Sequence, residues 1–207
     1  QEDVFFYLTL MNENYSHPEM PEDSYDGIIK GLYALNKASR PGKKHVNLMG
    51  SGTILEQARM AAEMLDEDFG VKSSLYSAPS LNELARDGAD CERWNRLNPL
   101  EKPKTHYVSE VFDGTKGPII AATDYMKSYA EQIRPYISQP YTVLGTDGFG
   151  RSDSRANLRR HFEVDANHIA AAAMVALYRE GAIDKKDLAK ALKKYEIDGD
   201  KPNPRLA

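Results

Sequence analysis

The hydrophobic positions of the chain fall into short runs that alternate between two spacings. Short apolar or β-branched runs are typical of buried strands; they occur at residues 4–11, 46–49, 74–78, 119–122 and 141–144, with a less regular candidate at 107–112. Between them, apolar residues at helical spacing predict helices over residues 22–36, 54–69, 125–134, 156–162, 166–180 and 185–195. A further helix is predicted to begin after Ser80, to be interrupted near Gly88 and to resume as far as residue 97.

Polar residues and glycines mark the ends of several of these helices. Ser80, with Glu83 three residues later, has the spacing of a capping box. Asp165 and Asp184 precede the last two helices, where an aspartate side chain caps the free N–H groups. Gly70 follows the helix at 54–69 and predicts its C-terminal stop.

The alternation of strands and helices predicts an α/β fold of three layers, in which a mostly parallel sheet carries helices on both faces. Residues 12–21 contain two prolines and residues 39–44 form a polar break, so we expect a domain boundary between residues 12 and 44. The chain opens at Gln1 rather than at Met and enters an apolar run almost at once. We therefore expect it to be part of a longer protein.

Composition narrows the class of function. The 207 residues carry a formal net charge of −4, which disfavours a dedicated nucleic-acid binder with a basic stripe. The single cysteine, Cys91, excludes an internal disulfide and a multi-cysteine metal site, and its helical position near Trp94 favours packing over reactivity. No apolar run reaches the ~20 residues of a membrane span, and the N-terminus lacks a signal-peptide pattern. We expect a cytoplasmic protein that binds neither nucleic acid nor membrane.

Several residues after predicted strands are candidates for ligand binding. Residues 50–53 (GSGT) join a strand to a helix, but the third glycine of the dinucleotide fingerprint and the phosphate-loop lysine are absent, which favours a tight turn. Asp124 and Asp147 each follow a strand, where open α/β sheets bind ligands and where turns also favour aspartate. No two histidines have the spacing of a helical zinc site; they lie at positions 17, 45, 106, 161 and 168.

The glycine-rich loop at residues 145–155 is the strongest candidate, because packing alone explains it least. Its candidate contact residues are Asp147, Arg151, Ser152, Asp153, Ser154 and Arg155. In one interpretation it is only a connecting turn between a strand and a helix, with Ser152 or Ser154 as the helix cap. In the other it is a recognition loop, whose arginines meet a carboxylate, a phosphate or an acidic partner near a helix N-terminus.

Several stretches carry a family resemblance. They are residues 10–15 (LMNENY), 83–88 (ELARDG), 90–95 (DCERWN), 123–127 (TDYMK), 144–155 (LGTDGFGRSDSR) and 203–207 (NPRLA). Together they resemble the C-terminal end of homodimeric bacterial pyruvate dehydrogenase, the decarboxylating first component of its complex. The resemblance covers essentially the whole chain.

The resemblance implies a mixed, mostly parallel sheet like that of the transketolase C-terminal domain. Residues 1–20 would then be the tail of a pyrimidine-binding domain with its linker, residues 21–44 a linker helix, and residues 45–207 the C-terminal α/β domain. The parent enzyme would decarboxylate pyruvate with thiamine diphosphate and Mg²⁺. It would pass the acetyl group to the lipoyl group of the dihydrolipoyl acetyltransferase component.

The family's metal–diphosphate motif and active-centre residues lie upstream, so the resemblance places no catalytic, cofactor-binding or metal-binding residue on this chain, and none on His17. It implies a structural and dimerisation role, with the 145–155 loop contacting upstream domains, the second subunit or the acetyltransferase component. A rival hypothesis is a free-standing α/β small-molecule or nucleotide-binding module that uses residues 50–53 and 145–155.

Overall fold

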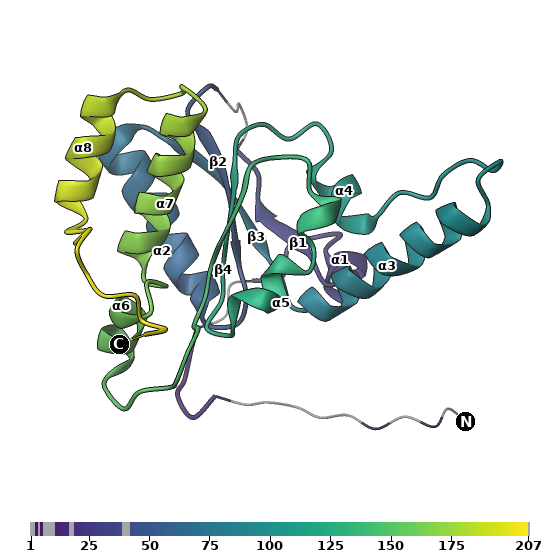
Figure 1. Ribbon diagram of the computed structural model, residues 1–207, viewed down its shortest axis with the longest axis horizontal. Coiled ribbons are helices and arrows are strands. Elements are labelled where there is room, and N and C mark those ends of the chain that lie inside the picture. Colours follow the sequence, from purple (N-terminus) through teal and green to yellow (C-terminus); the bar gives the residue numbers. More distant parts are fainter. Residues whose placement is uncertain (1–2, 4, 6–10, 17–18, 39–41, 207) are drawn as a thin grey trace.

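The computed structural model describes residues 3, 5, 11–16, 19–38 and 42–206, and within them a mixed sheet lies between two layers of helices (Figure 1). The sheet has the strand order β1-β3-β2-β4-β5. Its strands are β1 (Tyr33–Asn36), β2 (His45–Gly50), β3 (Lys72–Ser77), β4 (Ile119–Ala122) and β5 (Tyr141–Leu144). β2 pairs in parallel with β3 and β4, and β4 with β5, whereas β1 runs antiparallel to β3. The predicted α/β fold with a mostly parallel, mixed sheet is confirmed.

Each face of the sheet is covered by its own set of helices (Figure 1). One layer contains α2 (Ile54–Phe69), α6 (Arg155–His161), α7 (Ala166–Arg179) and α8 (Lys185–Lys194). The other contains α1 (Tyr25–Lys30), α3 (Leu81–Leu97), α4 (Tyr107–Phe112), α5 (Lys127–Glu131) and a 3₁₀ turn, Arg134–Tyr136. Successive side chains of a strand point to opposite faces, so Leu48 joins the core beneath α2 and α7 while Met49 joins the core beneath α3 and α4.

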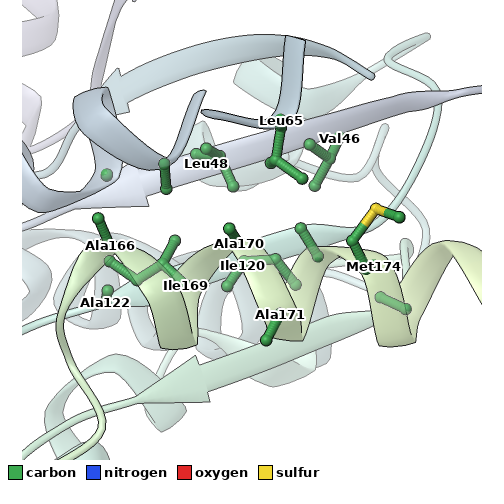
Figure 2. Close-up of a cluster of buried hydrophobic side chains, with 14 of the residues drawn as sticks. Val46, Leu48, Leu65, Ile120, Ala122, Ala166, Ile169, Ala170, Ala171 and Met174 are labelled. Carbon is green, nitrogen blue, oxygen red and sulfur yellow. The ribbon is translucent and has the colours of Figure 1, made fainter. Parts of the chain in front are cut away.

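The alanines of α7 belong to the core. Ala170 and Ala173 are fully buried, and Figure 2 shows Ala170 and Met174 of α7 on the side of the helix that faces Leu48 and Val46 of the sheet and Leu65 of α2. Short side chains let a helix approach its neighbours closely, and burial of the methyl groups stabilises the contact. The sequence alone allows this alanine-rich stretch to face either the core or another subunit, and its burial places it in the core.

Most of the predicted helix ends are confirmed. α2 has the predicted bounds, and Gly70 has the left-handed φ of 61° that stops a helix. The side chains of Ser80, Asp165 and Asp184 accept hydrogen bonds from backbone N–H groups three residues later, at 3.2, 2.9 and 2.7 Å respectively.

The predicted helix over residues 22–36 is wrong in its second half. α1 ends at Lys30, Gly31 turns the chain with a φ of 94°, and β1 then adds an antiparallel edge strand to β3. A side chain at position 31 would lie 2.4 Å from the carbonyl oxygen of Ser80, so only glycine fits this turn. Pairing with a distant strand has overridden the local helical spacing.

Three further predictions need correction, and a fourth falls mostly outside the described residues. Residues 107–112 form α4 and not a strand, because Val108 and Phe112 bury one helical face. α3 runs unbroken through Gly88, whose missing side chain makes room for the Tyr136 ring. Helix α5 spans only residues 127–131 of the predicted 125–134. The predicted strand at 4–11 lies outside the described residues, except for Phe5 and Met11, which have no strand structure.

Candidate functional site

The 145–155 loop leads from β5 into α6, and its last residues form the start of that helix. The Ser154 hydroxyl accepts a hydrogen bond from the Asn157 N–H at 3.3 Å, so Ser154 is the N-cap, while Ser152 is exposed. The Asp153 carboxylate accepts hydrogen bonds from the Asn157 amide at 2.9 Å and from the Ser154 N–H at 2.6 Å. These bonds hold the pKa of Asp153 below its usual range. Both side chains therefore stabilise the helix start.

Asp147 connects the loop to the helix layer beside it. Its carboxylate accepts a hydrogen bond from the Lys127 N–H at 3.1 Å and lies 3.8 Å from the Lys127 ammonium. The neighbouring Thr146 N–H donates to the carbonyl of Tyr125 at 2.9 Å. Asp147 thus fixes the position of the loop against the first residue of α5.

Arg155 contacts the segment that precedes α1. Its guanidinium lies 2.6 Å from the Glu13 carboxylate and donates a hydrogen bond to the Asn12 side chain at 2.5 Å. One turn further along α6, Arg159 donates to the Tyr15 hydroxyl at 3.3 Å. We call these five residues the linker clip. In one interpretation of the sequence the arginines of this loop meet a carboxylate, a phosphate or an acidic partner; Arg155 meets a carboxylate of the same chain.

The candidate residues of the loop do not share one ligand position in the described part of the chain. Asp147 faces Lys127, Asp153 faces the first turn of α6, and Arg155 faces the linker. Arg151 is exposed to solvent. The arrangement is suited to joining segments of the fold.

The C-terminal tail packs against this loop, which the sequence reasoning missed. Gly148 has a φ of 91°, and a Cβ there would lie 2.9 Å from the Cα of Arg205. A surface cavity of about 230 Å³ lies between the two segments. Its lining residues are Lys127, Gly145, Asp147, Phe162, Glu163, Lys201, Asn203, Pro204 and Arg205. The glycine pattern was the only local signal, because the tail lies far along the sequence.

Residues 50–53 and Asp124 meet at a second place on the same edge of the sheet. The chain moves from β2 to β3 on one side and returns past β2 to β4 on the other, and such reversals often form ligand crevices. Thr53 donates to the Asp124 carboxylate at 3.4 Å. A side chain at Gly50 would lie 2.4 Å from the Cα of Leu55, so this glycine is required by the tight strand-to-helix turn.

His45 and His168 have structural partners. His45 is buried between the Ser74 hydroxyl at 3.0 Å and the Lys116 carbonyl at 2.8 Å, and burial lowers its pKa despite the carbonyl contact. His168 lies 2.6 Å from the capping carboxylate of Asp165. Burial raises the pKa of Asp165, but the hydrogen bonds from His168 outweigh it and leave that pKa below its usual range.

The other histidine contacts form no metal centre in the described part of the chain. His106 lies 2.8 Å from Glu92, and His17 lies outside the described residues. The described residues hold no group of three or more His, Cys, Asp or Glu side chains placed to bind a metal ion. Nor does the described part of the chain contain a helix of the length and apolar character that a membrane crossing requires.

Comparison with known proteins relates the chain to one family. The model of the transketolase-like TK C-terminal domain matches residues 31–165. The protein named pyruvate dehydrogenase E1 component is 54% identical over 205 residues in Pseudomonas aeruginosa, covering 99% of this chain. Its namesake in Escherichia coli K12 is 54% identical over 208 residues, covering 100% of this chain. The chain spans 23% of the length of both relatives.

A solved structure of transketolase from Pichia stipitis agrees with the fold. It superposes with a TM-score of 0.50 at 17% identity, over 77% of this chain and 20% of that one. At this identity the likeness concerns the fold alone.

Proposed function

Since the chain belongs to the transketolase-like C-terminal domain family, we propose that it is the C-terminal domain of a pyruvate dehydrogenase decarboxylating component. The observation that carries the proposal is 54% identity to two proteins named pyruvate dehydrogenase E1 component, over 99–100% of the chain. The parent enzyme decarboxylates pyruvate and transfers the acetyl group to the lipoyl group of a dihydrolipoyl acetyltransferase component. It is a cytoplasmic homodimer that works in a multienzyme complex following glycolysis.

The domain's own role in this proposal is structural. Residues 1–20 connect it to a pyrimidine-binding domain, and the 145–155 loop is a contact surface for that domain, the second subunit or the acetyltransferase component. The linker clip supports this role, because Arg155 and Arg159 hold residues 12–15 against α6 with a charged and two neutral hydrogen-bonding partners. Charge-assisted contacts of this kind fix orientation more strongly than neutral ones.

In this proposal the parent's thiamine diphosphate and Mg²⁺ are bound by upstream domains and not by this domain. The Lys127 ammonium lies 3.8 Å from the Asp147 carboxylate and disfavours a divalent cation there, because like charges repel. The cofactor would supply the carbanion-stabilising chemistry in upstream domains. We expect the reading frame upstream of Gln1 to encode a Gly-Asp-Gly metal–diphosphate motif.

Calorimetry tests whether the cofactor is bound by this domain or by the upstream domains. Titration of the 207-residue chain with thiamine diphosphate and Mg²⁺ is expected to give only heats of dilution, whereas the protein extended by its upstream residues is expected to bind the cofactor and to decarboxylate pyruvate. Stoichiometric binding by the 207-residue chain would contradict the proposal. A nucleotide retained in native mass spectrometry would favour the rival small-molecule module.

Limited proteolysis tests the linker clip. Arg155→Ala is expected to speed cleavage within residues 11–16, because the segment loses both its ion pair and a hydrogen bond. Arg96→Ala, an exposed arginine on α3, serves as the control and is expected to leave that cleavage unchanged. Equal cleavage rates in the two variants would remove the evidence for the clip.

A further inference from the structure

The cavity between the 145–155 loop and the C-terminal tail, which we call the tail cavity, has an uneven balance of charge. Among its lining carboxylates, Asp147 lies 3.8 Å from the Lys127 ammonium and Glu163 lies 3.1 Å from the Lys201 ammonium. Lys201 also donates to the carbonyls of Arg160 and His161, at 3.1 and 2.6 Å, so all three of its protons are used. These contacts leave Arg205 as the uncompensated cation of the lining.

Arg205 has a free guanidinium within the described part of the chain. Only its backbone N–H has a partner, the Asn203 side chain at 3.0 Å. The ion pair of Lys127 is also loose, since 3.8 Å is beyond hydrogen-bonding distance. Two residues whose cationic groups have unused donors, Lys127 and Arg205, therefore line one cavity.

Two glycines of the loop allow the segments that carry these cations to pack closely against it. At Gly145 a Cβ would lie 3.0 Å from both the Cγ and the backbone nitrogen of Lys127, and at Gly148 it would lie 2.9 Å from the Cα of Arg205. A larger residue at either position would displace the chain segment that carries the cation. Figure 1 shows the C-terminal tail lying beside α6, the helix that begins where the loop ends.

We propose that the tail cavity binds a single oxyanion, the phosphate or carboxylate group of a small molecule, through Arg205 and Lys127. A guanidinium matches the geometry of both groups with paired N–H donors. The volume of about 230 Å³ is below the range of drug-sized ligand pockets, which begin at roughly 300 Å³. The nearby carboxylates of Asp147 and Glu163 disfavour a second negative group. This binding role goes beyond the proposed structural function and does not depend on the parent's chemistry.

Titration with simple anions tests the site. Inorganic phosphate and, separately, acetate are added to the 207-residue chain at constant ionic strength, and binding is followed by calorimetry and by NMR shifts of residues 145–148 and 201–206. Loss of a charged hydrogen-bond partner predicts at least about 10-fold weaker binding in Arg205→Gln. Lys127→Gln, which keeps the backbone N–H to Asp147, is expected to weaken binding by a smaller factor.

Arg179→Gln is the matched control, because Arg179 is an exposed arginine at the end of α7, outside the cavity lining. Its affinity is expected to equal that of the unmodified chain, and thermal unfolding checks that every variant is folded. Tighter binding of phosphate than acetate identifies a phosphate site, and the reverse a carboxylate site. Equal affinities in Arg205→Gln and Arg179→Gln, or no saturable binding of either anion, would overturn the proposal.

Discussion

Replacement of Gly148 by alanine tests whether the loop and the C-terminal tail hold each other in place. Gly148 has a φ of 91°, and a Cβ there would lie 2.9 Å from the Cα and 3.3 Å from the carbonyl oxygen of Arg205. A left-handed backbone costs an alanine about 1–2 kcal/mol, and the contact adds to that cost because backbone atoms cannot rotate aside. We expect Gly148→Ala to lower the free energy of unfolding by about 2 kcal/mol.

Gly150→Ala provides a control within the same loop. A Cβ at Gly150 meets no heavy atom within 4 Å, and its φ lies outside the left-handed region. This variant is expected to be neutral or more stable by up to about 1 kcal/mol, because alanine restricts the unfolded chain. A difference of about 2 kcal/mol between the variants corresponds to roughly 4–8 °C in Tm for a chain of this size.

Urea unfolding followed by circular dichroism measures the difference, and hydrogen exchange locates it. Amides of residues 201–206 are expected to exchange faster in Gly148→Ala and at the original rate in Gly150→Ala. Equal stability of the two variants would refute the strain argument. Destabilisation with unchanged exchange in the tail would show that backbone strain acts alone and that the loop does not hold the tail.

Further predictions concern buried groups away from the loop. Helix propensity alone would make Gly88→Ala stabilising by about 1 kcal/mol. Because a Cβ at this position would lie 2.1 Å from the Tyr136 ring, we instead expect the free energy of unfolding in urea to fall by about 1–3 kcal/mol. Asp90→Ala, at an exposed position of the same helix, is the control, and a gain in stability at Gly88 would contradict the packing argument. Because burial lowers the pKa of His45, the unfolded chain takes up its proton first as the pH falls below 6.5. Stability should therefore drop on acidification by at most about 1.4 kcal/mol per pH unit, and His45→Gln should flatten the curve; parallel curves would exclude this role. Burial raises the pKa of the Cys91 thiol, so it should react with a thiol reagent slowly when folded and rapidly in urea, and fast native reaction would argue against packing.

The loop of the candidate site was predictable from the sequence, but its contacts with distant residues were not. The loop at 145–155 was recognised from its glycines and charged residues, and Ser154 was one of two predicted caps. Its partners were not predictable, because Glu13 and Arg205 lie near opposite ends of the chain and no local pattern links them to Arg155 and Gly148. Whether the loop also contacts another domain or subunit stays a prediction.

The sequence by itself determined the features that depend on neighbours within about four residues, because helical and strand periodicities and caps act over that range. The bounds of α2, the cap of α7 at Asp165 and the buried strand β2 belong to this group. Only the tertiary structure decided features that depend on distant contacts. Gly31 ends a helix because β1 pairs with β3, and Gly88 continues one because the Tyr136 ring packs against it. The local sequence does not distinguish a glycine that ends a helix from one that lies within it, and the atoms packed against the glycine decide between the two.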